Sequence, residues 1–104
     1  MSVVVATDVD PGSGGSLVVI GGELDAGTAP RLGTALHDLV NEGATSITVD
    51  CSDLEFIDSQ GLGVLVAASR RLRDAGGQLH LRGVGDQLAR VLRLTRLDQV
   101  FLLE

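Results

Sequence analysis

The sequence predicts a single α/β domain, in which a mixed, mostly parallel β-sheet of about five strands packs with about three amphipathic helices. Apolar, β-branched segments are followed in turn by segments whose apolar residues recur at a three-and-four spacing. Glycines and prolines separate these segments, and 104 residues are enough for one hydrophobic core but too few for two. Strands that alternate with helices imply right-handed crossovers and parallel pairing. We therefore expect residues 1–104 to form one domain.

The first half of the chain predicts two strands, a helix and a third strand. Residues 3–9 and 17–20 are β-branched runs joined by a turn-rich insert, so they predict a hairpin whose first strand is an antiparallel edge. The helix is expected over 28–42, with a proline in its first turn and a glycine just after its end. Apolar and polar residues alternate over 47–51, as on a short strand.

The second half predicts two further helices and two further strands. A helix from about 59 to 75 ends at a pair of glycines. A short strand follows at 79–81, and Asp86 can cap a third helix. The apolar run 100–103 closes the domain as a last strand. The sequence contains no internal repeat and no linker.

Composition and charge argue against several classes of function. A net charge of -6, only two aromatic residues and no lysine disfavour binding to nucleic acid. The absence of lysine also argues against a receiver domain, whose phospho-aspartate site needs one. The single cysteine, Cys51, is expected to be a small core residue and fits a reducing compartment. No signal peptide and no apolar run near the ~18 residues of a membrane span are present, so we expect a cytoplasmic protein.

No residues form a recognisable catalytic or metal site. Ser59 lacks the glycine two residues earlier that a nucleophile elbow requires. The two histidines, His37 and His80, belong to segments whose ends do not point at Ser59, and Asp53 and Glu55 are expected to be solvated. We therefore expect a protein that is not an enzyme and that uses no cofactor or metal.

The start of the second predicted helix is unusual. It lies after a strand, at the edge where α/β proteins place their sites. Asp58 or Ser59 can cap the helix, which is worth about 1 kcal/mol. Gly61 and Gly63 follow at once, and each costs a helix about 1 kcal/mol relative to alanine. Their presence indicates close backbone approach by a neighbouring element or by a partner.

A phosphate on Ser59 would lie at a helix N-terminus, where free N–H groups and the helix dipole favour an anion by about 0.3–1 kcal/mol. Phosphorylation adds about -1.5 to -2 charges. A charge pair at about 4 Å near a surface is worth up to ~4 kcal/mol, so an acidic or tightly packed partner would release the modified chain. The helix start therefore predicts a site that is stable when modified and can act as a binding switch.

Three stretches together resemble a known family. They are GELDAGTAPRL at 22–32, ITVDCSDLEFIDSQGLGVLVAASRRLRDAGGQLHLRGV at 47–84 and LARVLRLTRLDQVF at 88–101. With them, nearly the whole chain resembles a STAS domain of the bacterial anti-sigma factor antagonist type. The most specific feature is a strand ending in Asp and followed by I-D-S-x-G-L-G-V-L, in combination with G-E-L-D upstream.

The resemblance implies a partner-switching protein. Ser59 would be phosphorylated by an anti-sigma factor that is itself a serine kinase of the GHKL ATPase type. The unphosphorylated antagonist would bind that kinase and free the sigma factor. The phosphorylated form would release the kinase until a PP2C-type phosphatase removes the phosphate. Asp25 matches an acidic residue beside the phosphosite, and Asp58 matches the residue before the acceptor. The expected partner-binding residues are Glu23, Asp25, Asp58, Gln60, Gly61, Leu62 and Gly63.

Two departures from the family pattern are visible. Gln60 occupies a place where many relatives have a second hydroxyl residue. The sequence ends at Glu104, right after the last predicted strand, whereas relatives commonly add a helix, so an uncovered apolar patch would favour a homodimer. The alternative function is an unphosphorylated STAS module, a scaffold or subunit of a stress-signalling or lipid-transport complex, in which Ser59 serves only as a helix cap.

Overall fold

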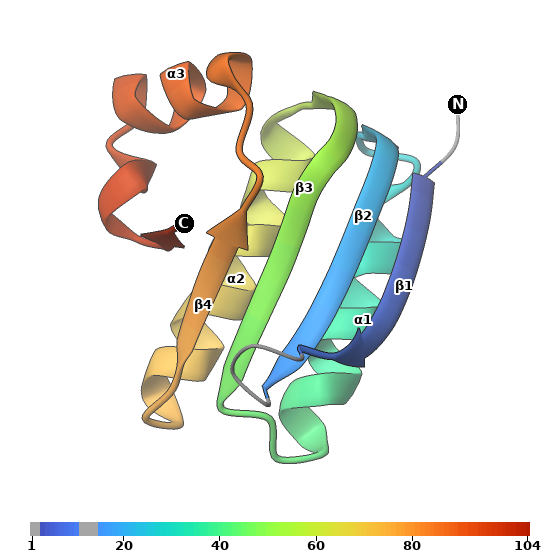
Figure 1. Cartoon of the computed structure of the whole chain (residues 1–104), viewed down its shortest axis with the longest axis vertical. Coiled ribbons are helices and arrows are strands. Elements are labelled where there is room, and N and C mark those ends of the chain that lie inside the picture. Colours follow the sequence, from blue (N-terminus) through green and yellow to red (C-terminus); the bar gives the residue numbers. More distant parts are fainter. Residues whose placement is uncertain (1–2, 11–14) are drawn as a thin grey trace.

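The computed structural model describes residues 3–10 and 15–104, so the tip of the predicted first turn lies outside the described residues. Its elements run along the chain as the sequence predicts, with one short 3₁₀ helix in addition (Figure 1). They are β1 (Val3–Val9), β2 (Ser16–Leu24), α1 (Ala29–Asn41), β3 (Ser46–Ile57), α2 (Ser59–Asp74), β4 (Gln78–Arg82), α3 (Asp86–Leu94), η1 (Leu97–Gln99) and β5 (Leu102–Leu103).

The strands form one sheet in the order β1-β2-β3-β4-β5. β1 is antiparallel to β2, and the other three pairs are parallel. α1 and α2 lie side by side behind the sheet in Figure 1, while none of the described helices covers the face toward the viewer. α3 lies beyond the end of β4. The predicted mixed, mostly parallel sheet with an antiparallel edge strand is therefore confirmed.

The hydrophobic core lies between the sheet and these two helices. It is almost entirely aliphatic, as two phenylalanines in the whole chain require. α1 contributes Leu32 and Leu36 and α2 contributes Leu65 and Leu72, at the spacing that predicted their helices. Burying each such side chain contributes about 1.5–3 kcal/mol. The core therefore fixes α2, and with it the start of that helix, against the sheet.

β3 is much longer than the predicted strand over 47–51, and it continues to Ile57. Its register with β2 shifts twice, so that residues 50–53 of β3 oppose 19–21 of β2 and a second irregularity follows. Such β-bulges interrupt the alternation of apolar and polar residues and re-aim side chains. The bulges are therefore the reason why the predicted strand is too short. β2 likewise continues to Leu24, so both strands extend toward the same edge of the sheet.

Two other boundaries differ from the prediction. Gly85 is the N-cap of α3 in place of Asp86, which is instead the first helical residue, where its charge suits the helix dipole. The last strand begins only at Leu102, because the chain before it forms η1 after Arg96 takes a left-handed conformation (φ 61°). This short helix brings Leu97 back toward α2, with which it shares a groove.

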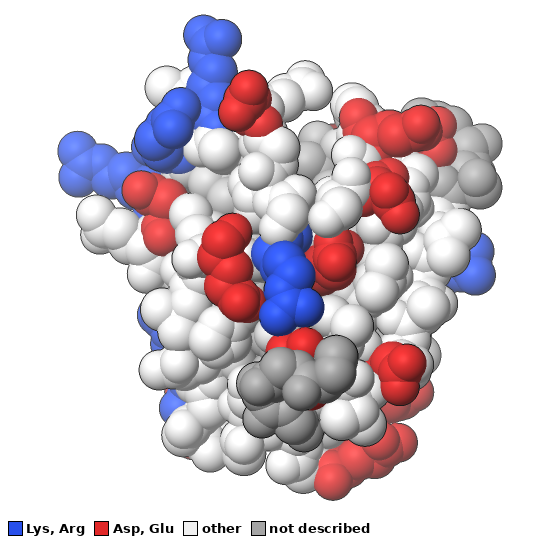
Figure 2. Space-filling model, in the orientation of Figure 1, with Lys and Arg blue, Asp and Glu red and all other residues white. Residues whose placement is uncertain are grey.

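The open face of the sheet carries charges near its middle (Figure 2). Asp10, only 3 % exposed, forms an ion pair with Arg82 at 3.2 Å. Arg82 also lies 3.6 Å from Glu104, which lies 3.8 Å from His80. The hydrogen bond to Asp10 is the main reason why the pKa of Arg82 is raised. This ion-pair cluster joins the start of the β1–β2 connection, β4 and the end of the described chain.

The outer edge of β1 is partly covered. The backbone N–H of Asp10 donates to the carbonyl of Gly15, its partner across the hairpin. The backbone N–H and C=O groups of the even-numbered residues of β1 therefore point toward β2, and those of the odd-numbered residues point away from the sheet. Of the outward groups, the carbonyl of Val3 accepts a hydrogen bond from Arg31 at 3.0 Å. The N–H of Val9 donates to the side chain of Asp8 at 2.8 Å.

Candidate functional site

The ends of β2 and β3 meet the start of α2 at one edge of the sheet. Leu24 and Ile57 are paired in the register of the two strands, and the N–H of Asp58 donates to the carbonyl of Leu24 at 3.1 Å. Glu23 and Asp25 flank Leu24 in the sequence. The acidic residues Glu23, Asp25 and Asp58, expected from two separate stretches of the sequence, are thus brought to the same edge.

Asp58, and not Ser59, is the N-cap of α2. Its backbone is extended (φ -111°, ψ -172°), and its Oδ1 accepts hydrogen bonds from the N–H groups of Gln60 at 2.9 Å and Gly61 at 3.1 Å. Ser59 is the first helical residue and is exposed. Its hydroxyl makes no hydrogen bond with any residue in the described ranges, 3–10 and 15–104. The hydroxyl is therefore accessible to an enzyme.

The environment of this hydroxyl differs from the expected one. Two N–H groups of the first turn, those of Gln60 and Gly61, are already bonded to the carboxylate of Asp58. The helix dipole still favours an anion there, but fewer N–H groups are available to a phosphate than the sequence suggested. A phosphate on Ser59 would also lie next in sequence to the negative charge of Asp58.

Asp25 organises the turn between β2 and α1. Its Oδ1 accepts hydrogen bonds from the N–H groups of Gly27 at 2.9 Å and Thr28 at 3.1 Å. The hydroxyl of the buried Thr28 donates to the carbonyl of Glu23 at 2.6 Å and accepts from the N–H of Asp25 at 2.9 Å. These bonds fix the direction of the Asp25 carboxylate.

The two glycines of α2 have different surroundings. Gly61 is buried, and a Cβ atom there would lie 2.8 Å from both the Cγ and the carbonyl oxygen of Leu24, and 2.9 Å from Cγ1 of Ile57. Gly63 is exposed, and a Cβ there would meet nothing within 4 Å among the described residues. Gly61 therefore serves close approach by a neighbouring element and does not itself offer contact surface. Only Gly63 is open to a partner.

A groove runs from Ser59 along α2 and is closed on its other side by the chain after α3. It includes Leu62 and Gly63, two of the expected partner-binding residues, whereas Gln60 is exposed but does not line it. Sequence reasoning missed the rest of the lining. The missed residues are Val66, Ala67, Arg70, Thr95 and Leu97. The first three lie on α2 at a three-and-four spacing from Ser59, and this spacing is a signal that could have identified them.

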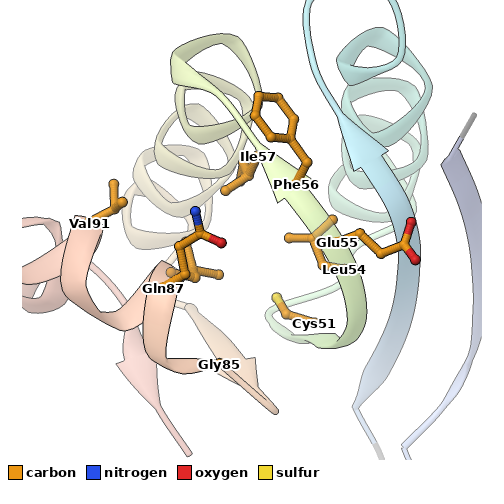
Figure 3. Close-up of a pocket in the computed structure, with 9 residues that line it drawn as sticks. Cys51, Leu54, Glu55, Phe56, Ile57, Gly85, Gln87 and Val91 are labelled. Carbon is orange, nitrogen blue, oxygen red and sulfur yellow. The ribbon is translucent and has the colours of Figure 1, made fainter. Parts of the chain in front are cut away.

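A second cavity lies between the end of β3 and the start of α3 (Figure 3). Cys51, Leu54 and Ile57 point from β3 into it, whereas Glu55 points away. Cys51 is 4 % exposed, and burial raises the pKa of its thiol to about 12, with the nearby charge of Asp50 as a lesser cause. Such a thiol is not reactive, so Cys51 is the core residue that the sequence predicted.

The remaining candidates lie elsewhere. His37 on α1 contacts Arg71, and His80 lies beside Glu104 on the open face of the sheet. Within residues 3–10 and 15–104, no three His, Cys, Asp or Glu side chains gather in a way that could hold a metal ion. None of the helices described is long and apolar enough to cross a membrane.

Comparisons with known proteins agree with one another. The family model described as "Mlab, STAS domain" matches residues 8–104. An anti-sigma-B factor antagonist of Listeria monocytogenes is 34 % identical over 83 residues, which are 80 % of this chain and 73 % of that protein. One of Staphylococcus aureus has the same identity and coverage of this chain, with 77 % of its own length. The crystal structure of an anti-sigma factor antagonist from Mycobacterium paratuberculosis has a TM-score of 0.86 and 31 % identity, covering 98 % of this chain and 85 % of that one.

Proposed function

The chain belongs to the STAS domain family, among the anti-sigma factor antagonists, and from this premise we propose that it is a binding protein switched by phosphorylation of Ser59. The unphosphorylated form binds an anti-sigma factor that is a serine kinase of the GHKL ATPase type, and the sigma factor is released. Phosphorylation ends this binding, and a PP2C-type phosphatase restores it.

The single observation that carries the proposal is the position of the Ser59 hydroxyl. It is exposed, it has no hydrogen-bond partner among the described residues, and it lies at the end of the groove along α2. Asp58 supplies the helix cap, so Ser59 is not needed for that role. A kinase can therefore modify the hydroxyl without removing a bond that holds the helix.

The surroundings of Ser59 explain how a phosphate would act on a partner. A partner seated in the groove would have to cover a group with about -1.5 to -2 charges, next to the carboxylate of Asp58. Removing such a charge from water without a matching cation is strongly unfavourable. If only half of the ~4 kcal/mol available to a surface charge pair opposes binding, the affinity falls more than tenfold.

Phosphate transfer tests the acceptor. We expect incubation with a purified anti-sigma serine kinase and ATP to add one phosphate, measured by intact mass, and the Ser59→Ala chain to remain unmodified. Ser52→Ala, which removes another exposed serine hydroxyl, is the matched control and should still accept the phosphate. A phosphate that persists in Ser59→Ala would overturn the assignment.

Affinity for the same kinase tests the switch. Calorimetry should give Ser59→Ala the affinity of the unmodified chain and Ser59→Asp an affinity lower by tenfold or more. The second candidate function is an unphosphorylated STAS scaffold or subunit, which the match of residues 8–104 to the STAS domain model also allows. In that case Ser59→Asp would bind its partner as tightly as the unmodified chain does.

A further inference from the structure

The groove along α2 has two chemically different ends. Ser59 lies at the first, and Arg70 lies at the other, eleven positions further along the helix or about 16 Å at 1.5 Å per residue. Between them the α2 side of the groove is uncharged, and the chain after α3 forms the opposite wall. The lining between the ends is made by Leu62, Gly63, Val66, Ala67, Thr95 and Leu97.

Arg70 differs from the other two arginines of α2. Arg71 contacts His37 and donates to Oδ1 of Asn41 at 3.2 Å, and Arg73 donates to the carbonyl of Val100 at 2.7 Å. Arg70 is exposed and has no hydrogen bond or ion pair with any part of the chain that the structure describes. Its guanidinium is therefore available to an anionic group from outside.

The middle of the groove suits a second helix. Leu62, Val66 and Leu97 are half-buried and expose part of their apolar surface. Gly63 and Ala67 lie one turn apart on α2, and no described atom lies within 4 Å of the place where a Cβ of Gly63 would be. Small residues at a contact allow two helix axes to come closer. A groove of about 16 Å corresponds to about three turns of a partner helix.

We infer that this groove takes an amphipathic helix of the anti-sigma factor, and that Arg70 pairs with a carboxylate at one end of that helix. The inference rests on the proposed function and adds the chemistry of the partner. The chain as a whole carries a net charge of -6, which repels acidic groups. Arg70 at the end of the groove provides a local positive charge to which a carboxylate of the partner can bind. Guanidinium and carboxylate form paired, charge-assisted hydrogen bonds, which give register as well as affinity. Ser59 at the opposite end then controls whether the helix can stay.

The test measures the affinity of the unphosphorylated chain for the purified anti-sigma serine kinase by calorimetry at two salt concentrations. We expect Arg70→Glu to weaken binding about tenfold or more and to reduce the salt dependence. Arg70→Lys should retain most of the affinity. Arg90→Glu makes the same change in net charge on the exposed surface of α3, outside the groove, and should change the affinity less than threefold. A Glu→Arg or Asp→Arg change in the kinase that restores binding to Arg70→Glu would identify the carboxylate.

The outcomes separate the inference from the function beneath it. If the unmodified chain binds the kinase and Arg70→Glu binds equally well, or Arg90→Glu loses as much, the inference is overturned and the proposed function stands. If Arg70→Glu is defective but Ser59→Asp is not, Arg70 is the anchor and the phosphorylation switch fails. If the unmodified chain does not bind the kinase, the inference and the proposed function are both contradicted. If the chain alone forms a dimer and Arg70→Glu abolishes it, the inference is overturned, because the groove then binds a second copy of this chain and not the kinase.

Discussion

At the scale of single residues, the start of α2 divides its tasks among neighbours. Asp58 satisfies two backbone N–H groups, and Ser59 keeps at the surface a hydroxyl that has no hydrogen-bond partner among the described residues. Gly61 allows the end of β2 to lie against the helix, and Gly63 leaves the groove open. Helix stability, tertiary packing and partner access therefore depend on different positions, and substitutions can separate them.

The two glycines provide a matched pair of substitutions. Gly61→Ala should destabilise the domain, because overpacking against Leu24 and Ile57 costs about 1–3 kcal/mol and outweighs the helix propensity gained. Gly63→Ala should stabilise it by about 0.5–1 kcal/mol, because the added methyl group meets open space. Urea unfolding measures both. Equal effects of the two changes would contradict the different surroundings described for them.

At the scale of elements, the helices were predicted best. Their apolar residues recur on one face, and that face is the one buried in α1, α2 and α3. The extent of β3 was not predicted, because its bulges break the alternation that marks a strand. The 3₁₀ helix η1 was also missed, since its three residues carry no periodicity that could identify them. Strand register and short helices depend on contacts with distant segments, which a local pattern does not contain.

The same distinction holds for the candidate site. Asp58, Ser59 and the two glycines lie in one continuous stretch, so the sequence could single them out. The joining of Leu24 to Asp58 follows from the parallel register of β2 and β3 and could be anticipated only in outline. The wall made by Thr95 and Leu97 comes from residues 36 and 38 positions after Ser59, and the resemblance of 88–101 to the family does not place them beside Ser59. Tertiary packing alone creates that half of the groove.

The buried thiol of Cys51 on β3 leads us to expect that the stability of the domain depends on pH. The pKa of Cys51 is raised from 9.0 to about 12 in the folded chain, so the folded state holds the thiol proton more tightly than the unfolded state. This contribution is complete below about pH 9 and is lost as the pH rises toward 12. The stability of the unmodified chain relative to Cys51→Ala should therefore shrink with rising pH in this range, as measured by urea unfolding. A difference that stays constant from about pH 7 to about pH 11 would contradict a protonated, buried thiol.

At the scale of the whole molecule, the two faces of the sheet are held by different forces. Aliphatic side chains pack on the helix-covered face, whereas the ion-pair cluster around Arg82 connects segments on the open face. Asp10 and Arg82 are far apart in the sequence, so their pairing closes the domain across the sheet. The Cα radius of gyration of 12.3 Å is close to the ~13 Å of a compact domain of 100 residues. The groove and Ser59 thus belong to one compact domain.

The outer edge of β1 gives a prediction about association. The double change Asp8→Ala with Arg31→Ala uncovers the N–H of Val9 and the carbonyl of Val3, so it should increase self-association at high concentration. Sedimentation velocity and light scattering measure this. The control is Asp74→Ala with Arg90→Ala, which makes the same change in net charge on exposed helix positions. Similar association of both double variants would show that the edge contacts have no such role.

The covering of β1 has a consequence for how the protein can be used by a cell. An antagonist that acts by capturing a partner works one molecule for one molecule, so it has to accumulate to the concentration of that partner. β1 is a β-branched strand with Val4 and Val9 more than half exposed, and such an edge invites growth into fibrillar aggregates as concentration rises. Arg31 and Asp8 each occupy a backbone group that the next strand would need. Two side chains that do not line the groove along α2 therefore help to set how much of the protein can accumulate without aggregating.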